Sequence, residues 1–323
     1  MNDDTTSSDV NGNNGDALHE EHTGQEWQQL NNQSRLYLLT DLCKFSLPYV
    51  DPGDKATSWS RINGNTLYTV SPNLYVKDKT QHALWPYGKI ARLLLIWIST
   101  QVMLHKADNL TLTLPQSLNQ LMQEIGIYRN DGKPNGREYA RYRTALQAIC
   151  GMRTQVTKYD GDDDNGMMSG KNLIIADTYN LGWGFKTVGE LSTISLNKST
   201  YEYMQHSTPL DAAAVYLLTN TNPLVRGRSR GQDLDLYTWL NARNYSLTHS
   251  PNRQTAPITW QQLANQFGNT YNNLHDFIKR FKVSLNNVRM VWPDLNVEIV
   301  NGQGIVLHQS QRSVNPKFRP TNK

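Results

Sequence analysis

Two ten-residue stretches of the chain share one pattern, and this repeat restricts the available folds most strongly. Residues 117–126 read SLNQLMQEIG and residues 259–268 read TWQQLANQFG. Each begins with a hydroxyl residue, which can accept a hydrogen bond from the first free N–H groups of a helix. Apolar residues follow at helical spacing, and the closing glycine can take the left-handed conformation that ends a helix. Each copy therefore predicts a short capped helix followed directly by a turn.

The segments after the two copies also correspond. A second helix is predicted over about 137–149 in the first half and over about 271–286 in the second. Strand-like runs follow the helices, at 153–159 and 172–179 in the first half and at 287–292, 297–300 and 304–309 in the second. The Asn-Gly-Gln-Gly turn at 301–304 favours a hairpin. Capped helix, turn, second helix and hairpin follow one another in this order in a winged helix-turn-helix.

The whole chain is thus predicted to have an α+β fold with two tandem winged helix-turn-helix domains, mostly helical, with β-hairpin wings. Further helices are expected over 26–43, 87–106, 209–220 and 233–247, and short strands over 65–77 and 110–114. The expected parts are a disordered acidic N-terminus (1–25), a first winged-helix domain (26–190), a connecting helix and basic linker (191–230), a second winged-helix domain (231–310) and a basic tail (311–323).

Charge is spread unevenly along the chain. The formal net charge is only +4, but residues 1–34 contain seven acidic residues and no Lys or Arg. The remainder therefore has 32 basic against 21 acidic residues, a net charge of +11. A basic body of this kind suits a polyanionic partner such as double-stranded DNA.

The polar faces of the two second helices contain the residue types that contact DNA. The major groove accepts one α-helix, where Arg and Lys meet phosphates or guanine and Asn and Gln pair with adenine. The candidate DNA-binding residues are Arg137, Arg141, Arg143, Thr144 and Gln147 in the first half, and Asn272, His275, Lys279, Arg280 and Lys282 in the second. A helix that only faces solvent has a similar polar face. The prediction of DNA contact therefore depends on the presence of two copies, each followed by a basic helix and a hairpin. Asp276 on the same face would repel phosphate, accept from a cytosine amino group or simply face solvent.

The RGRSR segment adds Arg226, Arg228 and Arg230 to these candidates. The three arginines could clamp phosphates between the two helices, or they could form a solubilising linker, and composition favours neither interpretation.

Motifs of enzyme chemistry do not stand out in the sequence. Residues 166–172 (GMMSGKN) lack the spacing and the hydroxyl of a phosphate-binding loop, and no HExxH pair occurs among the eight histidines. The acidic run DGDDDNG (160–166) departs from the calcium-loop pattern. Two cysteines form no disulfide framework or zinc set. We expect no catalytic residue, no metal and no cofactor.

The chain is also predicted to be cytoplasmic. No signal peptide precedes the polar start. The most apolar stretch, at 90–100, is too short to cross a bilayer and includes Arg92, so we expect no membrane association.

At the level of longer motifs, the sequence resembles the plasmid-encoded RepA replication initiators. The resemblance runs from about Pro86 to Ser310 and rests on PYGKIARLLLIWISTQ, LTLPQSLNQLMQEIGI, ARYRTALQAI, DLDLYTWLNAR, ITWQQLANQFG, FIKRFKVSL and VWPDLNV, in that order. It implies paired winged helices, binding to repeated sites (iterons) in a plasmid origin, opening of nearby AT-rich DNA and recruitment of the host initiator and replicative helicase. It also implies autoregulation and copy control, monomers and dimers with different roles, and a bacterial cytoplasm with nucleoid or plasmid association.

Two other functions remain open from the residues themselves. A transcriptional regulator with tandem winged helices would have the same physical features. A relaxase or nuclease that nicks DNA belongs to a different class, and Mg²⁺-dependent nicking of supercoiled DNA would support it.

Overall fold

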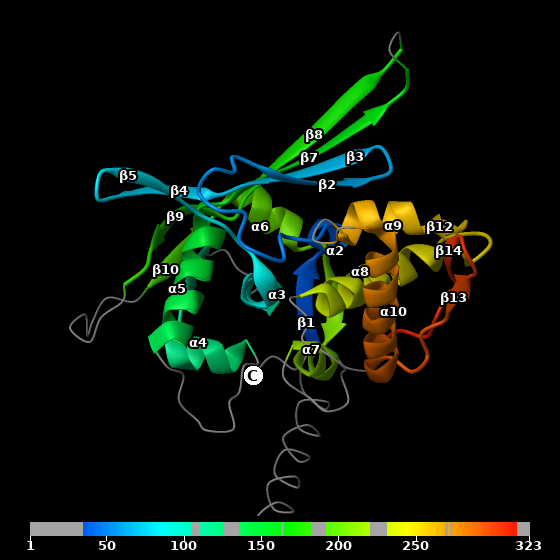
Figure 1. Cartoon of the computed structure of the whole chain (residues 1–323). Helices are drawn as coiled ribbons and strands as arrows, with labels where there is room; N and C mark the ends of the chain where they lie inside the picture. The colour runs from blue at the N-terminus through cyan, green and yellow to red at the C-terminus, as the bar shows by residue number, and fades with distance from the viewer. Residues whose placement is uncertain are drawn as a thin grey trace, which may run out of the picture.

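A computed structural model describes residues 35–104, 110–115, 117–125, 136–162, 165–182, 192–219, 231–268, 271 and 273–314. The predicted disordered start (1–25) and most of the predicted basic tail lie outside these residues. The chain folds into an α+β structure in which two similarly built units lie on either side of the molecule, below a shared sheet (Figure 1).

The first unit contains three helices and a three-stranded antiparallel sheet. In chain order these are α3 (Gly88–Leu104), β6 (Thr111–Thr113), α4 (Leu118–Glu124), α5 (Gly136–Gly151), β9 (Ala176–Asn180) and β10 (Thr193–Leu196). The strands are ordered β6-β10-β9. The helices expected over 87–106, 117–126 and 137–149 and the strand expected over 110–114 are therefore confirmed where the structure describes them. The predicted domain limit at 190 falls before β10 and stays a prediction.

The second unit repeats this order of elements. It consists of α8 (Gln232–Leu247), β12 (Ile258–Thr259), α9 (Trp260–Phe267), α10 (Leu274–Val291), β13 (Val297–Val300) and β14 (Gly304–Leu307). Its strands are ordered β12-β14-β13, so in both units the last strand lies between the other two. The predicted hairpin is confirmed, with Gly302 at φ 71° in its turn. A conformation of this kind favours glycine.

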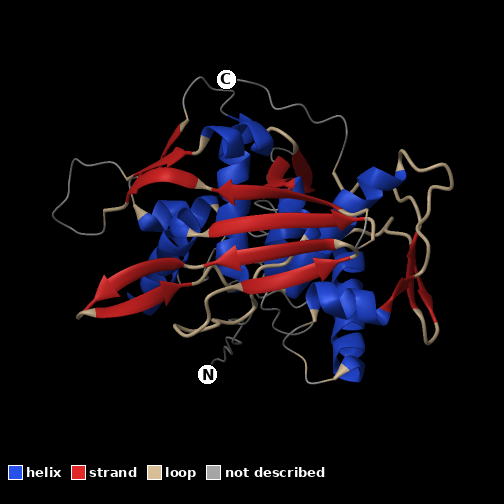
Figure 2. Cartoon of the chain, turned by 90° about the horizontal axis from the view of Figure 1, so that it is seen from above, coloured by secondary structure: helices blue, strands red, loops and turns tan. Residues whose placement is uncertain are grey.

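A third sheet crosses above both units (Figure 2). It is formed by β2 (Trp59–Asn63), β3 (Thr66–Ser71), β7 (Arg153–Asp160) and β8 (Met167–Ile174), in that order. The β7–β8 hairpin is inserted between α5 and β9, and it projects beyond the other strands (Figure 1). The sequence predicted 153–159 and 172–179 as the wing of the first unit. However, β7 pairs with β3 and so belongs to the third sheet. The strands that occupy the positions of β13 and β14 in the sheet of the first unit are β9 and β10.

The remaining elements pack around these sheets. They are β1 (Arg35–Leu39), α2 (Thr40–Lys44), β4 (Asn73–Lys77), β5 (Thr80–Leu84), α6 (Lys198–Met204), β11 (Ser207–Asp211) and α7 (Ala212–Thr219). The strands expected over 65–77 are confirmed as β3 and β4.

Several predicted element types were wrong. Of the helix expected over 26–43, residues 26–34 lie outside the described residues and 40–43 are helical in α2, but 35–39 form a strand because β1 pairs with β11 over its whole length. The same pairing makes 209–211 a strand rather than the start of a helix. The strand expected at 287–292 continues α10, since Val288 is fully buried on its inner face. Gly268 ends α9 at φ −107° and is not left-handed. Gly126 lies outside the described residues.

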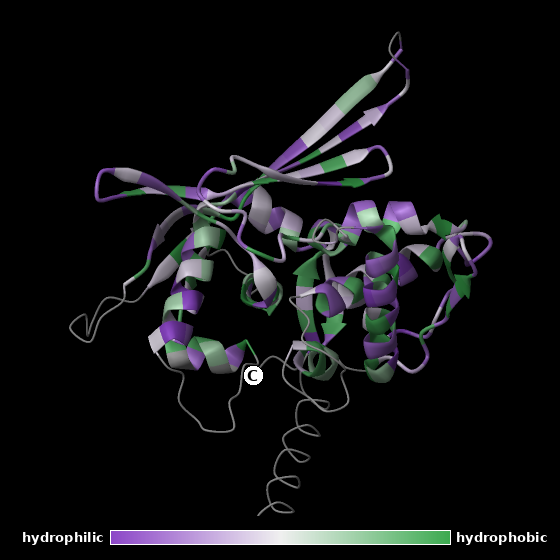
Figure 3. Ribbon diagram, in the orientation of Figure 1, coloured by the Kyte–Doolittle hydropathy of each residue, from purple (hydrophilic) through white to green (hydrophobic). Residues whose placement is uncertain are grey.

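One continuous apolar core connects the two units. It includes Leu94 and Ile98 of α3, Leu146 of α5, Leu236 of α8 and Phe281 of α10, which are all fully buried. In Figure 3, α3 and α7 are mainly hydrophobic, while α5 and α10 alternate between hydrophilic and hydrophobic residues. The helices α5 and α10 are thereby held at the outside of a single packed body.

Candidate nucleic-acid interface

The short helices α4 and α9 begin with the caps that the repeat predicts. The N–H of Gln120 donates to Ser117 Oγ at 3.1 Å, and the N–H of Gln262 donates to Thr259 Oγ1 at 3.2 Å. In the second unit the N–H of Thr259 also donates to Gln262 Oε1 at 2.8 Å, which completes a capping box. Such caps fix where each short helix starts and therefore how it presents the helix that follows.

Helix α10 has one apolar face and one polar face. Phe277, Phe281, Leu285 and Val288 are buried. On the opposite side, exposed polar residues recur at spacings of four, three and four, which places them in one line along the helix. This line, called the α10 stripe below, consists of His275, Lys279, Lys282 and Asn286. It contains two lysines and no carboxylate.

Asp276 has a local role at the start of α10. Its N–H donates to the side-chain oxygen of Asn273 at 2.8 Å, and the Asn273 amide donates to Asp276 Oδ2 at 3.0 Å. Asp276 is the third residue of the helix that Asn273 caps, and an acidic group in this first turn also interacts favourably with the helix dipole. Helix capping therefore accounts for a carboxylate on α10, although the Asp276 side chain is 57 % exposed.

Arg280 points away from the α10 stripe. Its Nη2 lies 3.6 Å from Oδ1 of Asp233, whose side chain is 0 % exposed, while Arg280 itself is 24 % exposed. Asp233 Oδ2 also accepts a 2.9 Å hydrogen bond from the Asn287 amide. The sequence placed Arg280 on the outer face of the helix. The structure instead gives it a partner on α8, which no local pattern reveals.

Aromatic rings support α10 from below. Phe281 lies 5.8 Å from Trp260, 6.1 Å from Phe267 and 5.6 Å from Phe277, measured between ring centroids. The Lys282 ammonium lies 5.8 Å from the Trp260 ring, within the range of a weak cation–π contact. The helix that carries the α10 stripe is therefore packed on a cluster of aromatic side chains.

Helix α5 is open to solvent mainly in its first half. Arg137, Arg141 and Arg143 are exposed, whereas Thr144 and Gln147 are half-buried. Near the end of the helix, the amide of Asn73 donates to the carbonyl of Gln147 at 2.8 Å, so β4 covers this part. Arg137 and Arg141 lie on one side of this exposed first half, and in a helix-turn-helix it is the N-terminal residues of the second helix that contact base edges.

A buried ion pair joins the first helices of the two units. The Arg92 guanidinium of α3 forms two hydrogen bonds to Asp235 of α8, Nε–Oδ1 at 2.6 Å and Nη2–Oδ2 at 2.8 Å. Its remaining N–H groups donate to the carbonyls of Leu47, Pro48 and Gly88. Burial alone lowers the pKa of Arg92, but the charge and hydrogen bonds of Asp235, together with Tyr49 and Tyr68, outweigh that effect, so the pKa is raised. Sequence reasoning missed this pair because its partners are far apart in the chain.

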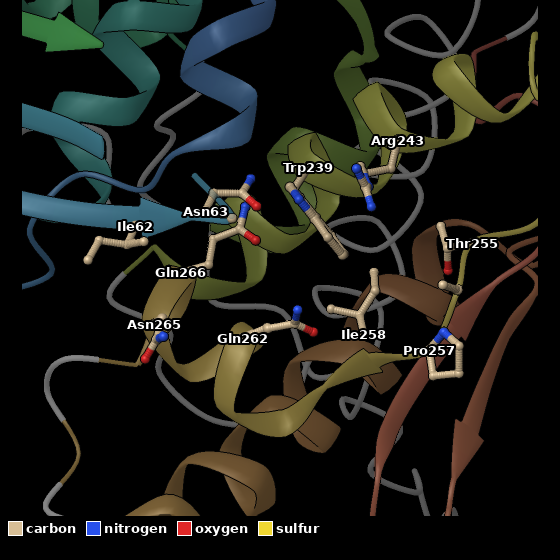
Figure 4. A pocket seen from close by; sticks show the side chains of 12 residues that line it. Ile62, Asn63, Trp239, Arg243, Thr255, Pro257, Ile258, Gln262, Asn265 and Gln266 are labelled. Carbon is tan, nitrogen blue, oxygen red and sulfur yellow. The ribbon is translucent and has the colours of Figure 1, made fainter. Parts of the chain in front are cut away.

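A cleft of about 410 Å³ lies between the β2–β3 turn, α8 and α9 (Figure 4). Arg243 and Trp239 line it, with the guanidinium carbon 5.7 Å from the indole ring. Burial lowers the pKa of Arg243. The wall formed by α9 is braced by Gln266, whose amide donates to the carbonyl of Lys44 at 2.6 Å. This contact ties α9 to the part of the chain that precedes the first unit.

Four of the candidate DNA-binding residues cannot be placed. Arg226, Arg228, Arg230 and Asn272 lie outside the described residues. Among the residues that the structure does describe, no group of three or more His, Cys, Asp or Glu side chains could hold a metal ion. Likewise, no helix within the described ranges is long and apolar enough to cross a membrane.

Comparison with known proteins gives one family and three chains of distantly similar solved structures, among them two crystal structures of RctB domains. A crystal structure of domains 2 and 3 of RctB aligns over 85 % of this chain and 99 % of its own, at 11 % identity and a TM-score of 0.47. A second structure of RctB domains 2–3 covers 83 % and 94 %, at 8 % identity and a TM-score of 0.42. No curated protein matches the chain. The family described as plasmid encoded RepA protein matches residues 85–262, more than half of the sequence. The chain therefore belongs to the plasmid-encoded RepA family of replication initiators.

Proposed function

We propose that both units are winged helices and that the chain binds repeated double-stranded sites in a plasmid origin through α5 and α10. The observation that carries this proposal is the duplicated topology. Each unit has a long helix, a short strand, a short capped helix, a third helix with exposed cations and two further strands, with the same strand order. A third helix presented by a short capped helix is the arrangement that places side chains in a major groove.

The two third helices offer different contacts. The α5 arginines can form paired hydrogen bonds to guanine or contact phosphates. The α10 stripe offers Lys279 and Lys282 as phosphate contacts and His275 and Asn286 as polar groups near the base edges. Arg280 is not part of this proposed surface, because its guanidinium pairs with Asp233. In this proposal the antiparallel strand pairs β9–β10 and β13–β14 are the wings that contact the adjacent backbone.

Membership of the initiator family supports the rest of the proposal. After binding its repeats, the chain opens nearby AT-rich DNA and recruits the host initiator and the replicative helicase. It represses its own gene by binding the same kind of site, with monomers and dimers in separate roles, and it acts in the bacterial cytoplasm on the plasmid.

Footprinting on the DNA that flanks the gene tests the binding step. Direct repeats that are protected one or two helical turns apart, roughly 10 to 21 base pairs, support two-helix binding to iterons. Protection confined to the promoter, in a plasmid that the chain cannot maintain, would indicate a transcriptional regulator. Incubating the chain with supercoiled origin DNA and Mg²⁺ adds a third result, since nicking would indicate a relaxase or nuclease.

A further inference from the structure

The first turn of α8 contacts both units through buried polar side chains. Asp235 binds Arg92 of α3, and Asp233, two residues earlier, binds Arg280 and Asn287 of α10. We call this set of residues, together with Gly231, the junction. Because α3 packs against α5 and α8 packs against α10, the junction lies on the path between the two helices proposed to read DNA.

The geometry of the junction leaves little freedom. A guanidinium that binds both carboxylate oxygens has one orientation, unlike an apolar contact, which tolerates sliding. The five N–H groups of Arg92 all have acceptors. Gly231 lies so close that a Cβ at this position would be 2.8 Å from Arg92 Cδ and Nε, and its φ of 118° is one that favours glycine.

The two units face opposite directions along their third helices. In Figure 1, α4 lies at the lower end of α5, whereas α9 lies at the upper end of α10, with α3 and α8 between them. A rigid connection between such units fixes both the separation of the two helices and their relative rotation.

We propose that the junction determines which spacing between two half-sites the chain accepts, an inference that rests on the proposed function above. Duplex DNA turns once in about 10–10.5 base pairs, so five added base pairs rotate one half-site by about half a turn. A rigid pair of units cannot follow this rotation. Loosened units can follow it, at the cost of ordering themselves on binding.

The test compares duplexes that contain both footprinted half-sites with the natural spacer or with about five added base pairs, and a duplex with one half-site. The variants are Arg92→Lys, which loses the bidentate fork, and Asp235→Asn. Glu202→Gln is the matched control, because it neutralises an acidic residue in an exposed pair, Lys198 Nζ–Glu202 Oε1 at 4.0 Å.

For the wild-type chain and Glu202→Gln, the added base pairs should weaken binding by about 100-fold, toward the affinity for one half-site. The junction variants should bind the natural site about 3- to 10-fold more weakly and lose less than about 10-fold on insertion. Their affinity for one half-site should stay within about twofold of wild type.

Two results would overturn the inference. In the first, folded variants lose as much affinity as the wild-type chain when five base pairs are added to the spacer. In the second, the variants lose as much affinity for one half-site as for the paired site, which would make the junction part of one unit's own fold. If Arg92→Lys does not fold, Gly231→Ala disturbs the junction while both Arg92 and Asp235 are present. Its affinities for the natural site, the lengthened site and one half-site are then compared in the same way. A wild-type chain that protects no repeated sequence refutes the proposed function itself, whereas a wild-type chain that discriminates spacers like its variants refutes only this inference.

Discussion

Neutralising two adjacent cations of α10, Lys279 and Arg280, should produce opposite results. Removing one partner of a buried ion pair costs about 3–5 kcal/mol, because the other charge stays in a poorly solvated place. For Arg280→Met we expect the lower end, about 3 kcal/mol. The reason is that Arg280 is 24 % exposed, and Asp233 keeps its 2.9 Å hydrogen bond from Asn287.

Lys279→Gln removes the same charge one residue earlier, from the α10 stripe. Its side chain is exposed, so the free energy of unfolding should change by no more than about 0.5 kcal/mol. If Lys279 neutralises a phosphate, the slope of log K against log salt should become shallower by about 0.9. Folded Arg280→Met should keep the wild-type slope.

Urea unfolding, followed by tryptophan fluorescence, to which the buried Trp85, Trp97, Trp239, Trp260 and Trp292 contribute, measures the stability change. Fluorescence anisotropy with origin DNA at about 50 to 200 mM salt measures the slope. Asp233→Asn in the Arg280→Met background is the control, since it removes the uncompensated charge and should recover most of the lost stability. If Arg280→Met were as stable as wild type and had the shallower slope, Arg280 would contact DNA and the reasoning would be refuted.

Three further predictions concern the second unit and the thiols. Thr259→Ala removes the capping box and should lower the free energy of unfolding by about 1 kcal/mol in urea titrations, and an unchanged midpoint would contradict the cap. Trp260→Ala leaves a cavity beside Phe281 and should cost about 3–5 kcal/mol in the same assay, so a loss below about 1 kcal/mol would contradict tight packing there. Burial raises the pKa of Cys43 and of Cys150 to about 12, so both thiols stay neutral at pH 8. A thiol reagent should label them only after unfolding, and rapid labelling of the native chain would contradict their burial.

Features set by nearby residues could be predicted from the sequence. Ser117 and Thr259 mark the starts of α4 and α9 because a hydroxyl cap acts on N–H groups within one turn. The hairpin around Gly302 follows from its turn residues. The exposed Arg137 and Lys279 follow from helical periodicity, since each lies opposite a clearly apolar face.

Features set by distant partners could not be predicted in this way. Apolar residues at 35–39 fit either a helix or a strand, and β11, which decides the outcome, lies more than 160 residues later. Arg280 looks like an outer residue until Asp233 is brought beside it by the packing of α8 on α10. The inserted β7–β8 hairpin has the same strand signal as a wing, and only its pairing with β3 tells the two apart.

The shared sheet also affects how the chain can be made. Val70 of β3 pairs with Thr154 of β7. Strand β7 leaves the ribosome only after α3, α4 and α5 have been synthesised. Until then, the β2–β3 hairpin has an unpaired edge, and long-range pairing of this kind is slow and prone to intermolecular strand association. A fragment that starts at residue 85, where the family match begins, would lack β3 altogether and leave β7 without that neighbour. Expression of shortened chains should therefore retain residues 59–71, however compact the downstream region looks by itself.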